Sequence, residues 1–405
     1  MADGDGPEVL DLGLVDTPGQ DPSSPAPSRR RISRRGLVVL GGVAVLGGGI
    51  AAVRAGSSPA SSGPRTRAAP IPTVTAGPGP QTSGSGEVVV TELGHPLLGG
   101  TQVDVFGFSN SAIARIELAT GRVTRTALPP VSDAPLTFAV VRGGVIVHRN
   151  DSGPSYLVPD GRPPVRLSSG LDGPGPLLPG PDLDHVWVLQ GSGQRAILVL
   201  KSLDGRPTPT AIGLPAYMSE EPLPDGAGYP LLFGVGGVYW ARPQGLQRVT
   251  AGAVVASGPT GWLVLECDDR DRCSGTFVAR TGTRRRVLGL VDPQLPLGQT
   301  ALLTGAVSPD GGRAAFYLGD PLGALRLAVL DLATGDRLGT DVAMIGGAVS
   351  QSLAWTPDGR WLFAVDASAR ILVVDPSTGT AAPLVPGTIV PALPVVEQIA
   401  VRSVA

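Results

Sequence analysis

Short apolar runs of four to seven residues recur along the chain from Glu87 onward and alternate with residues that favour turns. The runs are rich in Val, Ile and Leu and are too short for helices, so they predict β-strands. No amphipathic helix pattern is found after residue 86. Clear examples of these runs are 103–106, 144–147, 186–189, 196–200, 262–265 and 371–374.

Two segments in the last quarter of the chain have the same layout. Each opens with a Pro-Asp-Gly turn, continues with two strand-like runs separated by a loop, and closes with an Asp-x-x-Thr-Gly turn. Pro fixes one φ angle, Asp and Gly close a tight turn, and the last Gly takes a positive φ. The shared positions are Pro309, Asp310, Gly311, Asp331 and Gly335 in the first segment, and Pro357, Asp358, Gly359, Asp375 and Gly379 in the second.

The glycine of the closing turn defines a period. Its copies are Gly121, Gly161, Gly205, Gly245, Gly282, Gly335 and Gly379, spaced by 43 residues on average. A repeat of about 40–45 residues with four strand-length runs is the period of a β-propeller blade. Residues 87–405 therefore predict an all-β propeller of about seven four-stranded blades, with six or eight as alternatives. The strand-like runs 87–91 and 395–401 lie at the two ends and are predicted to pair within or beside the closing blade.

The Pro-Asp-Gly and Asp-x-x-Thr-Gly pair resembles the repeats of TolB-like and YVTN-type (WD40-like) bacterial β-propellers. The similarity to true WD40 blades is poor, because the chain contains no Trp-Asp dipeptide and its only Gly-His is Gly94-His95. The resemblance implies a propeller of such repeats and assigns no ligand.

The N-terminal region has the layout of an export signal. Residues 1–28 contain six acids and no Lys or Arg, which predicts a disordered acidic tail. Five arginines then lie within 29–35, ahead of the uncharged apolar run 37–53. Ser33, Arg34, Arg35 and Leu37 resemble the twin-arginine export motif, and the alternative is a generic single-pass anchor. The segment 29–55 is therefore expected to engage the twin-arginine export machinery transiently.

The sequence leaves open whether this segment is removed. Cleavage near Ala55 would release a secreted protein, whereas the short run 37–53 would act as a transmembrane helix if retained. Retention is slightly favoured, because a long acidic tail is unusual before a cleaved signal. Residues 56–86, of which 26 are Gly, Pro, Ser, Thr or Ala, predict a flexible linker. The expected location is the cell envelope, outside the cytoplasm.

Composition and charge exclude several classes of function. The formal net charge is −2 and the only lysine is Lys201, so there is no basic field for nucleic acid. Arg284, Arg285 and Arg286 form the only basic run in the repeat region, and we interpret them as a solvated outer strand rather than a polyanion site.

Cys267 and Cys273, the only cysteines, flank the sequence Asp-Asp-Arg-Asp-Arg between two strand-like runs. In an exported protein this spacing predicts a disulfide. A metal site would need further ligands, and no His lies nearby. The acids between the cysteines lack the spacing of an EF-hand and are interpreted as a solvated loop.

The sequence contains no recognised catalytic constellation. His95, His148 and His185 form no metal-binding pair, and no nucleophile elbow or dinucleotide fingerprint occurs in a strand–helix context. No catalytic, cofactor or metal-binding residue is therefore assigned. The favoured function is a non-catalytic binding or scaffold module for an envelope protein, glycan or wall component. The alternative is an extracytoplasmic hydrolase or lyase with its site at the channel mouth, since the fold hosts both.

Overall fold

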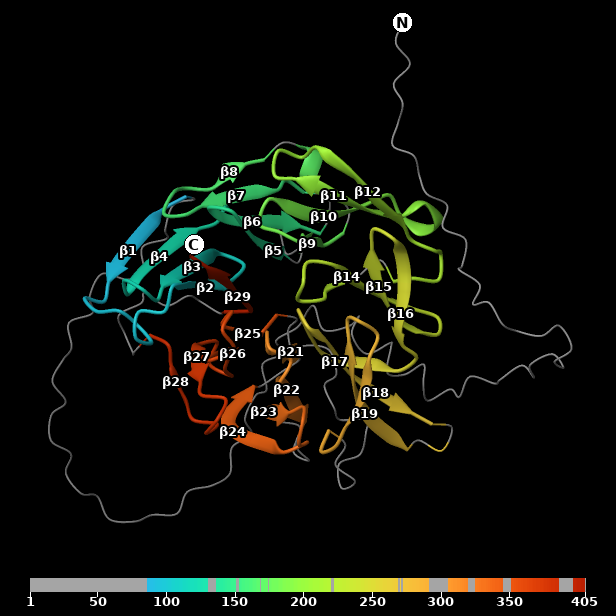
Figure 1. Ribbon diagram of the computed structural model, residues 1–405. Helices are drawn as coiled ribbons and strands as arrows, with labels where there is room; N and C mark the ends of the chain where they lie inside the picture. The colour runs from blue at the N-terminus through green and yellow to red at the C-terminus, as the bar shows by residue number, and fades with distance from the viewer. Residues whose placement is uncertain are drawn as a thin grey trace, which may run out of the picture. The chain divides into compact units, whose positions relative to one another are not determined.

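The described part of the chain is built almost entirely from β-strands (Figure 1). The structure is a computed structural model, and it describes residues 86–129, 136–150, 153–167, 169–173, 175–219, 222–268, 270, 272–290, 305–319, 325–344, 351–385 and 396–404. Within these residues the only helical turns are two short 3₁₀ segments, η1 (Ser169–Leu171) and η2 (Gly193–Arg195). The acidic tail, the export motif and the linker expected before residue 86 lie outside the described residues.

The strands form antiparallel blades, numbered here in chain order. Blade 1 contains β1 (Val88–Glu92), β2 (Val103–Phe108), β3 (Ala112–Glu117), β4 (Arg122–Ala127) and β29 (Gln398–Ser403). Blade 2 contains β5 (Leu136–Val141), β6 (Gly144–Arg149), β7 (Tyr156–Pro159) and β8 (Val165–Arg166). Blade 3 contains β9 (Leu177–Pro179), β10 (His185–Gln190), β11 (Ile197–Ser202) and β12 (Pro207–Gly213).

The other blades have the same order, from an inner to an outer strand. Blade 4 contains β13 (Leu223–Pro224), β14 (Pro230–Gly234), β15 (Gly237–Arg242) and β16 (Gly245–Thr250). Blade 5 contains β17 (Ala253–Gly258), β18 (Gly261–Cys267), β19 (Cys273–Ala279) and β20 (Arg284–Val287). Blade 6 contains β21 (Gly305–Val307), β22 (Arg313–Gly319), β23 (Leu325–Asp331) and β24 (Arg337–Met344). Blade 7 contains β25 (Leu353–Trp355), β26 (Leu362–Val365), β27 (Ile371–Val374) and β28 (Ala381–Pro383).

These blades confirm the predicted propeller. Five of the sheets are separate, and the sixth has eight strands in the order β20-β19-β18-β17-β21-β22-β23-β24. That sheet consists of blades 5 and 6, which are joined only where their innermost strands pair in parallel, at Ala256 with Gly305 and Ser257 with Ala306. In Figure 1 the innermost strands gather around a common centre.

The two ends of the described chain meet in blade 1, as predicted. The last strand, β29, is innermost and pairs antiparallel with β2 from Val103–Ser403 to Phe108–Gln398. The first strand, β1, lies on the outer side and pairs with β4. Closure therefore adds one strand from each end to a core of three, and blade 1 has five strands.

Apolar clusters lie between neighbouring blades, which explains the continuous apolar runs of the sequence. The second strand of a blade is covered on both faces, and β2, β6, β10, β18 and β26 are buried along most of their length. Between blades 1 and 2, for example, Phe108 stacks on Phe138 with ring centroids 4.4 Å apart. A strand buried on both faces loses the alternation of a half-exposed strand.

The repeated turns join the strands that the sequence indicated. The Pro-Asp-Gly turns connect the two inner strands of blades 6 and 7, β21 to β22 and β25 to β26. The seven period-marking glycines all lie at the hairpin between the third and fourth strands, and all have a positive φ. At Gly121, with a φ of 74°, an added Cβ would also lie 1.9 Å from the carbonyl oxygen of His95.

The aspartate of each Pro-Asp-Gly turn organises the hairpin through its carboxylate. Asp310 accepts hydrogen bonds from the Ser308 hydroxyl at 2.6 Å and from the backbone N–H of Gly312 at 3.0 Å. Asp358 accepts the matching pair, from the Thr356 hydroxyl at 2.5 Å and from the Arg360 N–H at 3.0 Å. These hydrogen bonds favour the ionised form and lower the pKa of both aspartates.

This arrangement predicts acid sensitivity of the two turns. A carboxyl group whose pKa is lowered by folding contributes stability above its unfolded pKa of about 3.9 and loses it as the pH falls. We expect the urea midpoint of the full chain to drop between pH 6 and pH 3, and to drop less in the double variant Asp310→Asn, Asp358→Asn. An equal drop in the double variant would show that the turn carboxylates do not contribute.

Candidate functional site

A cavity of about 570 Å³ lies at the centre of the propeller. Residues from the innermost strand of every blade line it, and the exposed faces are mainly apolar. Representative lining residues are Phe138, Leu231, Val254, Val307, Leu353 and Ile399. The volume lies within the range of small-ligand sites, about 300–1,000 Å³.

Few polar side chains reach this wall. Among the described residues that line it, Asp182 is the only charged one, and Ser257, Gln351 and the indole of Trp355 are the other polar ones. The Trp355 N–H is already used, since it donates to the carbonyl oxygen of Ala306 at 2.9 Å. The cavity therefore offers a ligand mainly apolar side chains and strand backbone, with few polar side chains to form hydrogen bonds.

One end of the cavity is bordered by the turns between the first and second strands. In blade 3, Asp182 Oδ1 lies 2.7 Å from His185 Nδ1, and both side chains are partly exposed. Arg142, from the matching turn of blade 2, forms a two-point ion pair with Asp184, at 2.7 and 2.8 Å. These groups are paired with one another at the rim and do not point to a shared reacting centre.

The other end of the cavity is bordered by Gln351, which precedes β25. Its φ of 67° lies in the left-handed region, which is uncommon for a residue other than glycine. Its carbonyl oxygen accepts the Ile399 N–H at 2.8 Å. Two residues before Ile399, Glu397 accepts a hydrogen bond from Asn110 at 3.0 Å, and burial raises the pKa of its carboxyl group.

The three histidines differ in environment. His148 is fully buried in blade 2, where Nδ1 lies 2.9 Å from the Ser155 hydroxyl and Nε2 lies within 3.2 Å of the carbonyl oxygens of Gly173 and Gly175. Ser155 is buried too, so this Ser–His pair supports the connection between blades 2 and 3 and is closed to a substrate. His95 is exposed, and His185 belongs to the rim described above.

Within the described residues, no three His, Cys, Asp or Glu side chains are grouped so that they could hold a metal ion.

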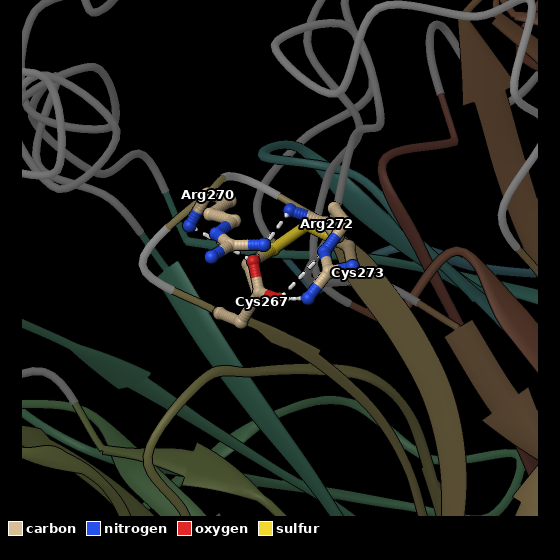
Figure 2. The surroundings of a disulfide bond; sticks show 5 residues. Cys267, Arg270, Arg272 and Cys273 are labelled. Atoms are coloured by element: carbon tan, nitrogen blue, oxygen red, sulfur yellow. Dashed lines mark hydrogen bonds and ion pairs between the residues drawn. A yellow bond between two sulfur atoms is a disulfide. The ribbon is translucent and has the colours of Figure 1, made fainter.

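Cys267 and Cys273 lie opposite each other at the ends of β18 and β19, where the structure joins their sulfur atoms (Figure 2). The loop between them is organised by Asp268, which accepts the backbone N–H groups of Arg270 and Arg272 and the guanidinium of Arg272. These bonds lower the pKa of Asp268 and occupy its carboxylate. The disulfide in the cell stays a prediction, and Asp269 and Asp271 lie outside the described residues.

The arginine run lies on β20, the outermost strand of blade 5, as interpreted from the sequence. All three residues are exposed. Arg284 binds Glu266 at 2.7 Å and the carbonyl oxygen of Val249 at 3.2 Å, and Arg285 lies over the ring of Phe277. At the outer edge of blade 5, the side chains of Arg284 and Arg285 therefore contact neighbouring strands.

The export motif Ser33, Arg34, Arg35 and Leu37 and the apolar run 37–53 lie outside the described residues. Among the residues from 86 onward that the structure describes, no helix is long and apolar enough to span a membrane. Export, anchoring and the cleavage site near Ala55 stay predictions.

Fold and cavity together define a β-propeller with an apolar central cavity. The sequence matches no protein-family model, and no curated protein resembles it in sequence. Among solved structures it is similar to a functionally unknown protein from Desulfotomaculum acetoxidans, with 12% identity, 74% of this chain and 98% of that chain covered, and a TM-score of 0.45.

Two further similar structures carry different names. One is a putative 6-phosphogluconolactonase from Bacteroides fragilis, with 11% identity, coverage of 71% and 95%, and a TM-score of 0.39. The other is TolB from Acinetobacter baumannii, with 11% identity, coverage of 69% and 79%, and a TM-score of 0.38. At these scores the similarities carry no functional argument, so the fold assignment rests on the sheet topology and the TolB-like resemblance of the repeats stays a prediction.

Proposed function

We propose that this chain is an exported or membrane-anchored cell-envelope protein whose propeller is a non-catalytic binding module, with its ligand in the central cavity. The observation that supports this is the cavity itself, which all seven blades border with apolar side chains. Removing apolar ligand surface from water at such a wall contributes about 25 cal/mol per Å².

The chemistry of the wall favours an apolar segment of a protein over a glycan or a wall polymer. A sugar ligand needs several hydrogen-bonding side chains, whereas the lining offers the carboxylate of Asp182, the hydroxyl of Ser257 and the amide of Gln351. An apolar peptide segment needs few hydrogen-bonding side chains, because its own amide groups can form hydrogen bonds with the strand backbone.

The experiment fills the cavity in one variant and leaves it open in a matched one. Ala354 lines the cavity on β25, whereas Ala382 is exposed on β28, the outermost strand of the same blade. The full chain, Ala354→Trp and Ala382→Trp are titrated with N-phenyl-1-naphthylamine, a neutral apolar fluorophore. We expect saturable binding to the parent and to Ala382→Trp, and loss of binding in Ala354→Trp.

The same three chains are then used for cross-linking in intact cells and capture through a C-terminal tag. An envelope protein captured by the parent and by Ala382→Trp, and lost with Ala354→Trp, supports the proposal. Equal capture by all three chains places the partner elsewhere and contradicts the cavity as the binding site. Turnover of a metabolite by the purified chain would favour the enzyme alternative.

A further inference from the structure

Two tryptophans and two arginines meet between blades 4 and 5. Trp240 of β15 and Trp262 of β18 pack edge to face, with ring centroids 5.1 Å apart. The guanidinium carbon of Arg280 lies 5.0 Å from the Trp240 ring and 4.7 Å from the Trp262 ring. The guanidinium carbon of Arg242 lies 5.1 Å from the same Trp240 ring. One indole therefore supports two cations.

The first of these cations is fully neutralised within the protein. Arg280 donates to Asp225 Oδ2 at 2.6 Å and to the carbonyl oxygens of Asp225, Gly258 and Pro259 at 2.7–3.0 Å. The other carboxylate oxygen of Asp225 accepts the backbone N–H groups of Ala227 and Tyr229, both at 2.8 Å. Both oxygens of Asp225 are thus engaged, and its charge balances Arg280.

The second cation, Arg242, has no carboxylate partner of this kind among the described residues. Arg242 is partly buried, and among the described residues no carboxylate oxygen lies within 4.0 Å of its guanidinium and no acceptor bonds to it. Its Nε is enclosed and has no hydrogen-bond partner in the part of the chain that the structure describes. The indole N–H of Trp240, a residue only 8% exposed, is likewise enclosed without a partner. Enclosed donors and a partly desolvated cation are costly unless an acceptor or an anion satisfies them.

We propose that this position between blades 4 and 5 is an oxyanion-binding site, in which Arg242 binds a carboxylate or phosphate group of a ligand. A guanidinium presents parallel N–H donors that match the two oxygens of either group, and the Trp240 ring fixes its plane. Arg280, itself fixed by Asp225, also packs against the Trp240 ring and so holds it in place. Arg242 does not line the central cavity, so the proposal does not depend on the proposed function.

Arg360 provides a matched control on blade 7. Its guanidinium carbon lies 5.5 Å from the Trp361 ring, but Arg360 is exposed, whereas Arg242 is partly buried. The full chain, Arg242→Gln and Arg360→Gln are titrated calorimetrically with inorganic phosphate and, separately, with N-acetyl-aspartate. Circular dichroism verifies that each variant is folded, and Arg242→Lys is the second variant if Arg242→Gln is not.

Saturable binding of either probe by the parent and by Arg360→Gln, weakened at least about tenfold in Arg242→Gln, supports the site. Arg242→Lys is expected to bind more weakly than the parent, because an ammonium lacks the planar fork. Preference for phosphate identifies a free-phosphate type of ligand, and preference for N-acetyl-aspartate a carboxylate one. Binding that is equal in the parent and Arg242→Gln, or no saturable binding of either probe, overturns the proposal.

Discussion

Replacement of Arg402 by alanine is expected to lower the free energy of unfolding by about 3 kcal/mol. Arg402 lies on β29, the strand that closes the ring, and its side chain is 8% exposed. It donates to Asp104 Oδ2 at 2.6 Å and to Asp160 Oδ2 at 2.7 Å. Asp104 belongs to β2, and Asp160 to the outer hairpin of blade 2, so one side chain links the last strand to two blades.

The size of the effect follows from the carboxylate that would be left behind. Asp104 is 1% exposed, and among the described residues only Arg115, at 3.0 Å, would remain as its counter-ion without Arg402. Breaking a buried ion pair typically costs about 3–5 kcal/mol, and the remaining Arg115 places this case at the lower end. Marginal stability makes such a loss a large fraction of the total.

Urea unfolding of the full chain measures this effect. Arg122→Ala in the same blade is the matched control, because its ion pair with Glu92 joins two exposed side chains and contributes little. Arg402→Lys keeps the charge but not the fork and should give an intermediate midpoint. A midpoint for Arg402→Ala equal to that of Arg122→Ala would contradict the closure role.

The second large effect is expected at Arg280. Arg280→Ala should also destabilise by about 3 kcal/mol, because it leaves the fully buried Asp225 without a counter-ion among the described residues. It also removes the cation from between Trp240 and Trp262. The Arg280–Asp225 ion pair joins blade 5 to a turn of blade 4. We therefore expect blades 4 and 5 to separate more readily in Arg280→Ala.

Arg285 on the same blade is the control for this prediction. Its guanidinium also lies over an aromatic ring, that of Phe277, but it is exposed, so Arg285→Ala is expected to change stability little. Urea midpoints of both variants are compared, together with hydrogen exchange of the β15 and β18 amides. Unchanged exchange in Arg280→Ala would show that the pair does not hold blades 4 and 5 together.

The fold was predictable because propeller blades repeat local chemistry. The positive-φ glycines mark one hairpin in every blade, and the period alone counts the blades. The second strands were recognisable as continuous apolar runs, since neighbouring blades cover both of their faces. Outer strands such as β8 and β20 carry exposed residues and lack this signal, so their bounds required the structure.

The candidate sites were not predictable from the sequence for a physical reason. Asp104 and Arg402 are 298 residues apart, and Asp225 and Arg280 are 55 apart, so no local pattern pairs them. Arg242 and Trp240 are two residues apart on one strand face, which is a weak signal until the second arginine is seen on the same ring. The cavity arises from seven strands that never adjoin in sequence.

The position of β1 has a mechanical consequence. A pull on the chain at residue 86 acts first on β1, which is attached at the outer edge of blade 1 through its pairing with β4. If β1 detaches, blade 1 keeps β29, β2, β3 and β4, the four strands of an ordinary blade. Tension at this end is therefore released by a single peripheral strand, while the strand that locks the ring, at the opposite edge of the same sheet, stays unloaded.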